Sequence, residues 1–167
     1  MNIPGTFLSL LIAGLGSLQA VAADNSSQNS DPSLFDIREQ DWRNGAMVYQ
    51  VLVDRFAPAA DLQAKIHLYA PPKILRQWDE TPKAGVYLEE AGVWSHEIDF
   101  WGGDIDSLRG KLSYINELGM DVLYLNPIHS GFTNHKYDSL DFETISPEFG
   151  DRKDVSKLAN DLHKQDM

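Results

Sequence analysis

The chain has 167 residues, with 14 Lys and Arg against 25 Asp and Glu, a formal net charge of −11, and no cysteine. This acidic balance disfavours nucleic acid and anionic lipid as partners, because both repel a negatively charged surface. Without cysteine there is no disulfide framework, so stability must come from an apolar core or from bound metal.

The first 23 residues contain no Lys, Arg, Asp or Glu. An apolar run over residues 7–18 precedes a small-x-small pattern at Ala20 and Ala22, which is typical of a secretory signal peptide. The run is shorter than the roughly 20 residues that span a bilayer. We therefore expect residues 1–22 to be removed on export, leaving a secreted or periplasmic protein without a membrane span. An uncleaved anchor is the alternative.

Residues 23–41 are expected to form a flexible leader. Their polar stretch, residues 24–33, includes Pro32 and offers too little apolar surface to offset the entropy lost on ordering. No internal repeat and no second boundary follow, so we expect residues 42–167 to belong to a single domain.

The first expected strand covers residues 46–53, AMVYQVLV, a run rich in β-branched and aromatic residues that suits a strand covered on both faces. A helix is expected over residues 105–118, where apolar residues recur at spacings of three and four. Asp104 is placed to cap the start of this helix, and Gly119 lies just beyond its end.

A second strand is expected over residues 122–126, VLYLN, and Pro127 ends it. A second helix is expected after Asp151, with apolar residues at 155, 158 and 162 on one face. The order strand, helix, strand, helix predicts parallel pairing of the strands through a right-handed crossover.

Two connections that follow strands are unusually long, residues 57–103 and residues 127–150. Loops beyond about 12 to 15 residues are often functional. In a (β/α)8 barrel the active site is built from the loops that follow the strands. A doubly wound sheet also binds ligands at this end, but no GxGxxG or GxxxxGK[ST] phosphate motif occurs here.

Four sequence blocks resemble the α-amylase superfamily of glycoside hydrolases, family thirteen. The blocks are VYQVLVDRF at 48–56; WGGD at 101–104 with Lys111, Leu112 and Tyr114; GMDVLYLNP at 119–127; and NHKYD at 134–138 with Asp141, Pro147, Phe149 and Gly150. Their order and spacing agree with the family over residues 42–167. The chain is therefore identified as a member of this superfamily.

The resemblance implies an α/β fold, the N-terminal portion of a (β/α)8 TIM barrel. The portion comprises the first two βα units with long βα loops, and it is incomplete. The implied activity is retaining hydrolysis of α-glucosidic bonds, mainly α-1,4, in starch or malto-oligosaccharides. In the family the catalytic carboxylates follow the fourth, fifth and seventh strands, so we assign no catalytic residue and expect the 167-residue chain alone to be inactive. A noncatalytic glucan-binding or structural relic of the same fold is the alternative, and the oligomeric state is left open.

The resemblance also implies one wall of a sugar site. Tyr137 matches the tyrosine that stacks on the glucose ring whose bond is cut, and His135 and Asn134 beside it are candidates to bind sugar hydroxyls. The alternatives are a loop tyrosine packed on its neighbours and a structural histidine. Asp138 is expected to order the loop.

Some relatives bind calcium near the WGGD turn, through a Gly carbonyl and an Asp carboxylate that correspond to Gly102 and Asp104. Calcium takes 6 to 8 oxygen ligands. Those relatives supply several ligands from an Asn/Asp-rich stretch, where this chain reads APAAD at 57–61. A calcium site at Gly102 and Asp104 thus competes with helix capping by Asp104, and no other cofactor is expected.

Overall fold

The computed structural model describes residues 32–167, so the expected signal peptide, residues 1–22, lies outside the described residues. The chain divides into two units between Asp41 and Trp42. In the first unit, part of the segment expected as a leader forms helix α1 (Pro32–Glu39). The side chains of residues 33–39 are all exposed, so among residues 32–167 this helix has no part in the core.

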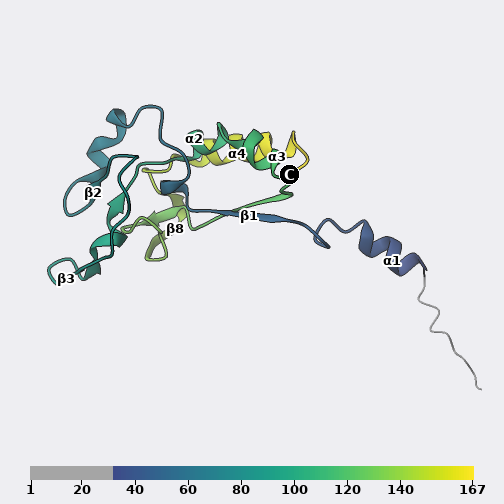
Figure 1. Ribbon diagram of the computed structural model, residues 1–167, viewed down its shortest axis with the longest axis horizontal. Coiled ribbons are helices and arrows are strands. Elements are labelled where there is room, and N and C mark those ends of the chain that lie inside the picture. Colours follow the sequence, from purple (N-terminus) through teal and green to yellow (C-terminus); the bar gives the residue numbers. More distant parts are fainter. Residues whose placement is uncertain (1–31) are drawn as a thin grey trace, which may run out of the picture. The chain divides into compact units, whose positions relative to one another are not determined.

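A pair of parallel strands forms the centre of the second unit (Figure 1). Strand β1 (Val48–Val51) pairs with β6 (Val122–Leu125), in the register that sets Val48 opposite Val122. The parallel pairing predicted from the element order is confirmed. Strand β1 is shorter than predicted, because the chain turns into the 3-10 helix η1 (Val53–Arg55) directly after Leu52.

The helix expected over residues 105–118 is two helices, α2 (Ile105–Arg109) and α3 (Leu112–Glu117). The prediction of one continuous helix was wrong because Gly110 ends α2 and Lys111 leaves the helical region, with φ −113° and ψ 8°. Glycine is a poor helix former, so a break costs least there. The predicted apolar stripe survives the break, and all of its residues except Leu118 are buried.

Helix α4 (Arg152–His163) begins where the sequence predicts. The Asp151 carboxylate accepts hydrogen bonds from the backbone N–H groups of Lys153 at 2.7 Å and Asp154 at 3.0 Å, which satisfies donors that have no partner inside the helix. Arg109 of α2 pairs with Asp161 of α4 at 2.5 Å. This contact joins the two helices beside their shared core.

Helices α2, α3 and α4 lie together on one side of the strand pair (Figure 1). The core between helices and strands consists of Val51, Val53, Ile105, Leu108, Leu112, Ile115, Phe149 and Leu158. Tyr49 and Leu123 pack against it. Because side chains alternate along a strand, Val48 and Tyr124 point to the opposite face, where they are 55% and 51% exposed.

The two long connections contain short regular elements. Between β1 and α2 lie η2 (Gln63–Tyr69), β2 (Ile74–Leu75), β3 (Tyr87–Leu88), β4 (Val93–Trp94), η3 (Ser95–Glu97) and β5 (Asp99–Phe100). Strands β2 and β5 pair in parallel, and β3 and β4 form an antiparallel hairpin. Between β6 and α4, strands β7 (His129–Gly131) and β8 (Ser139–Ile145) form a second antiparallel hairpin.

Within residues 32–167, the sheet that contains β1 and β6 has two strands. The described part of the chain therefore shows an α/β arrangement with helices on one face of a parallel pair. None of its helices is both long and apolar enough to cross a membrane.

Candidate functional site

The site region begins at the carboxyl end of β1, where Asp54 is completely buried. Its carboxylate accepts hydrogen bonds from the backbone N–H groups of Trp101 at 2.9 Å and Gly102 at 3.0 Å. Burial raises the pKa of Asp54 to about 6, although these two hydrogen bonds act to lower it. Asp54 thus fixes the WGGD turn against the end of the strand.

The two glycines of that turn are required for different reasons. Gly102 has φ +77°, a left-handed conformation that side chains disfavour. Gly103 donates its N–H to the carbonyl oxygen of Asp54 at 2.9 Å. A Cβ at Gly103 would lie 2.3 Å from the carbonyl oxygen of Val53, so only glycine allows this close approach of two backbone segments.

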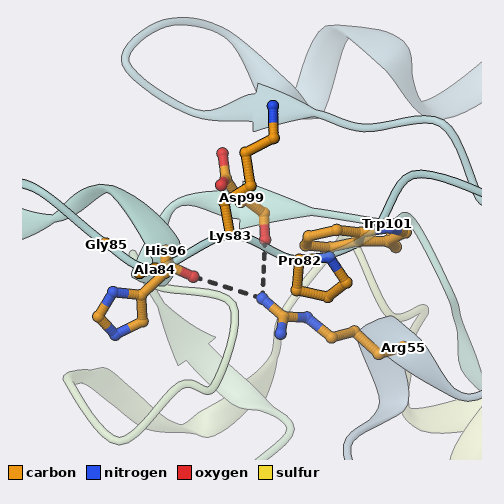
Figure 2. A pocket seen from close by; sticks show the side chains of 8 residues that line it. All are labelled: Arg55, Pro82, Lys83, Ala84, Gly85, His96, Asp99 and Trp101. Atoms are coloured by element: carbon orange, nitrogen blue, oxygen red, sulfur yellow. Dashed lines mark hydrogen bonds between the residues drawn. The ribbon is translucent and has the colours of Figure 1, made fainter.

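A pocket with a volume of about 250 Å³ lies beside this turn. Figure 2 shows the side chains that line it. The guanidinium of Arg55 lies over the Trp101 ring, 4.3 Å from its centroid. It points toward the carbonyl oxygens of His96 and Asp99, at the long hydrogen-bond distances of 3.4 Å and 3.5 Å. The lining residues are Arg55, Pro82, Lys83, Ala84, Gly85, His96, Asp99 and Trp101. The pocket therefore presents an aromatic ring and a cation, with carbonyl oxygens at its wall.

The loop after β7 joins the wall of this pocket through Asn134. The side-chain amide of Asn134 donates to the carbonyl oxygens of His96 at 2.7 Å and Asp99 at 2.9 Å, and its backbone N–H donates to the carbonyl oxygen of Glu97 at 2.7 Å. Asn134 is only 3% exposed. Because its amide hydrogens are engaged by backbone, Asn134 has a positioning role here and does not face solvent as a sugar ligand would.

His135 is half-buried, and each of its two ring nitrogens has a polar partner that fixes the orientation of the ring. The backbone N–H of Tyr137 donates to Nδ1 at 3.1 Å, and Nε2 lies 3.4 Å from a carboxylate oxygen of Glu97. The pKa of Glu97 is lowered, chiefly by the backbone N–H of Trp94 and further by His135. His135 is thus held in place beside the tyrosine that the sequence singled out.

Tyr137 has the most exposed side chain of the three predicted sugar-binding residues, at 64%. Its ring is tilted against the ring of His135, with 5.6 Å between centroids. The exposed ring therefore stands next to an oriented imidazole, on the loop between β7 and β8.

Asp138 orders the base of this loop, as expected from the sequence. Its carboxylate accepts hydrogen bonds from the backbone N–H groups of Phe132 at 2.8 Å and Thr133 at 3.0 Å, and from the Thr133 hydroxyl. Burial acts to raise the pKa of Asp138, but these hydrogen bonds outweigh it and the pKa is lowered. The loop that carries Tyr137 is therefore tied down from within.

Sequence reasoning missed a buried ionic cluster beneath the loop. Lys136 is completely buried, and its ammonium donates to the carbonyl oxygen of Gly131 at 2.9 Å and lies 3.3 Å from the Glu148 carboxylate. Lys73 and the Ser146 hydroxyl also contact that carboxylate. Burial acts to raise the pKa of Glu148, but the two lysines and Ser146 outweigh it and the pKa is lowered. No periodicity distinguishes these loop residues from solvated ones, so no local signal could have found them.

The residues present at the expected calcium site do not fit the ion. The ammonium of Lys65 donates to the carbonyl oxygen of Gly102 at 3.3 Å and to one Asp104 carboxylate oxygen at 2.9 Å. The other Asp104 oxygen accepts from the backbone N–H of Ser107 at 2.7 Å, which caps α2. Among the described residues, no cluster of three or more His, Asp or Glu side chains could hold a metal.

Helices on one face of a parallel strand pair, with long loops at the carboxyl ends, are compatible with part of a (β/α)8 barrel. Residues 50–167 match the family described as alpha amylase, catalytic domain. The chain belongs to this family, the α-amylase superfamily of glycoside hydrolases.

Curated relatives include an amylopullulanase of Thermoanaerobacterium saccharolyticum, 34% identical over 161 residues, which are 91% of this chain and 12% of the relative. A cyclomaltodextrinase of Thermoanaerobacter pseudethanolicus is 30% identical over 123 residues, 74% of this chain and 18% of the relative. The chain thus spans less than a fifth of the length of these relatives.

A similar solved structure is the cyclic alpha-maltosyl-(1→6)-maltose hydrolase from Arthrobacter globiformis in complex with maltose. It is 28% identical, with a TM-score of 0.58, and the match covers 76% of this chain and 24% of the hydrolase. The same hydrolase has also been solved with its cyclic substrate.

Proposed function

We propose that residues 42–167 form the first two βα units of a (β/α)8 barrel in a retaining glycosidase. The proposed substrates are starch or malto-oligosaccharides, cut mainly at α-1,4 bonds. Membership of the α-amylase family and the parallel β1–β6 pair with helices on one face support this. The maltose complex of a similar hydrolase supports a glucan as ligand.

The observation that carries the proposal is the exposed ring of Tyr137 on a loop held by buried polar contacts. A tyrosine ring offers a flat apolar face to a pyranose and a hydroxyl to water. Asn134 and Asp138 fix the backbone on both sides of it, so little entropy is lost when sugar binds. Tyr137 and His135 thus form one wall of the proposed sugar site, with Asn134 as its support.

In this proposal the catalytic carboxylates lie on other strands of the barrel. The conspicuous carboxylates of the described residues have other partners: Asp104 and Asp151 cap helices, and Asp138 binds its own loop. We therefore expect the 167-residue polypeptide alone to show no hydrolysis.

Sugar binding is tested on the natural protein, including any sequence that follows Met167. Tyr137→Ala should weaken binding of maltoheptaose roughly tenfold, or about 1.4 kcal/mol, because the stacking face is lost, while Tyr137→Phe keeps most of it. Isothermal titration calorimetry measures both. Tyr114→Ala, which removes a half-exposed tyrosine from α3, is the matched control and should change nothing. Equal affinity of Tyr137→Ala and wild type would contradict the assigned wall.

Hydrolysis is tested with starch, pullulan and a cyclomaltodextrin. The natural protein should release sugars whose anomeric carbon is initially α, which proton NMR of the early products detects. Binding of glucan without turnover would favour the noncatalytic alternative. Turnover by the 167-residue polypeptide alone would overturn the placement of the carboxylates on other strands.

Export is a separate part of the proposal, and it concerns residues that the structure does not describe. We propose that residues 1–22 are a signal peptide removed on export. N-terminal sequencing of the mature protein should begin at residue 23 or 24. A mature protein that retains Met1 would contradict this.

A further inference from the structure

The ammonium of Lys65 is bound by oxygens from three separate segments of the chain. It donates to the carbonyl oxygen of Gly102 at 3.3 Å, the Asp104 carboxylate at 2.9 Å and the carbonyl oxygen of Glu148 at 2.9 Å. The side chains of Lys65 and Asp104 are only 17% and 16% exposed. A lysine ammonium has three N–H donors, and here each has an acceptor.

Two of these three oxygens belong to the residues that would hold calcium at the WGGD turn. Because Lys65 contacts Gly102 and Asp104 at once, its nitrogen lies at the point shared by the two prospective ligands. A metal ion there would have to displace the ammonium. The second oxygen of Asp104 is engaged by Ser107, so the carboxylate has no oxygen to spare for a second cation.

The carboxylates of Asp104 and Glu148 already have cationic partners. Asp104 pairs with Lys65, and Glu148 pairs with Lys73 and Lys136. Adding a doubly charged cation to this group would place it among like charges in a poorly solvated region. Calcium also needs 6 to 8 oxygens, and residues 57–61 read APAAD with one carboxylate.

Helix η2 places Lys65 at the turn. Asp61 accepts the backbone N–H of Ala64 at 3.1 Å at the start of this helix, and Tyr69 at its end is buried against Phe100, with 5.3 Å between ring centroids. The helix is therefore held at both ends. Lys65, the third residue of this helix, thereby reaches the WGGD turn.

We propose that the ammonium of Lys65 takes the place of a divalent cation at the WGGD turn, so that this turn is held without bound metal. A tethered cation stabilises the turn at any metal concentration, whereas the stabilisation by a bound ion vanishes when its free concentration falls well below the dissociation constant. This inference does not depend on the sugar chemistry proposed above.

The test is thermal unfolding of the natural protein in excess EDTA and in excess calcium chloride. Wild type should melt at the same temperature in both. Lys65→Met keeps the apolar stem but removes the charge, and it should melt a few degrees lower in EDTA because Asp104 loses its partner. Calcium should restore little of that loss, because the vacated position offers three oxygens whereas calcium takes 6 to 8. Lys157→Met, which removes an exposed lysine paired with Asp154, is the matched control and should respond to neither condition.

A further variant, Lys65→Met with Asp104→Asn, keeps a helix cap but removes the carboxylate that has lost its partner, and it should recover part of the stability lost in Lys65→Met. The proposal is overturned if Lys65→Met is as stable as wild type, or if Asp104→Asn recovers none of the stability lost in Lys65→Met. It is also overturned if EDTA lowers the melting temperature of wild type and Asp104→Asn alone abolishes that effect.

Discussion

The helix layer and the turn region of this protein are held together by different forces. The helix layer, formed by α2, α3 and α4 on the β1–β6 pair, buries apolar side chains, and each of them makes many weak packing contacts. The turn region, formed by Asp54, residues 101–104, residues 131–138 and Glu148, instead buries carboxylates and ammonium groups that pair with few partners.

Because different forces hold them, the two regions should respond differently to a single substitution. Apolar burial is non-directional, so a lost methyl group costs an amount set by the atoms removed. A buried charge that loses its partner costs far more than an exposed one. The turn region should therefore be the more fragile of the two. The predictions below apply to the natural protein, with any sequence that follows Met167.

The largest effect is expected for Glu148→Gln. The amide keeps the shape of the side chain but removes the negative charge that faces Lys73 and Lys136. Leaving buried ammonium groups without a partner should lower the free energy of unfolding by about 3 to 5 kcal/mol. Urea unfolding measures this loss of free energy. Asp106→Asn in the helix layer removes an exposed partner of Arg109 and should cost less than about 1 kcal/mol. An equal loss in the free energy of unfolding of the two variants would contradict the proposed difference between the regions.

The pH dependence of stability should reveal the raised pKa of the buried Asp54. Its pKa of about 6 in the folded protein exceeds the ordinary value of 3.8, so the folded state binds the proton more tightly than the unfolded state. The resulting stabilisation is complete below about pH 4 and is lost as the pH rises through 6, a change of about 3 kcal/mol. We expect the free energy of unfolding to rise as the pH falls from 7 to 5, measured by urea titration at each pH.

Asp54→Asn is the control for this pH effect, because an amide does not titrate in this range. The variant should lack the rise between pH 7 and pH 5. Asp138 and Glu148 act in a different window: their pKa values are lowered, so their contribution is present above about pH 4 and is lost as the pH falls further. An unchanged pH profile in Asp54→Asn would count against burial of a charged Asp54.

The helix layer was predictable from the sequence, and the turn region was predictable only in part. Apolar spacing locates the stripe of α2 and α3, and Asp151 marks the start of α4, because both signals are local. The break at Gly110 was missed, since one glycine does not interrupt the spacing of its neighbours. Lys65 and Lys136 were missed because their partners lie far along the chain, where only folding brings them together.

Two glycines, one in each region, should differ in how well they tolerate a side chain. Gly103→Ala in the turn region would bring a Cβ to 2.3 Å from the carbonyl oxygen of Val53, and the backbone would have to move apart. We expect a loss of about 1 to 3 kcal/mol in the free energy of unfolding. Gly110→Ala in the helix layer has a negative φ of −64° and should change stability by less than about 1 kcal/mol in either direction. Thermal unfolding compares the two, and a tolerated Gly103→Ala would contradict the close backbone approach.

The smallest effect tests the β1–β6 strand pair on which the helices pack. Val51 of β1 is buried against the helix layer, whereas Val48 points to the other face and is 55% exposed within the described residues. Threonine replaces one methyl by a hydroxyl of the same size. Val51→Thr should cost at least about 1 kcal/mol, because the hydroxyl is buried without a partner. In a barrel the face opposite the helices is the packed interior, so Val48→Thr should cost a similar amount in the natural protein. No loss at Val48, measured by the same urea unfolding, would count against the barrel proposed for residues 42–167 and leave the strand pair with one covered face.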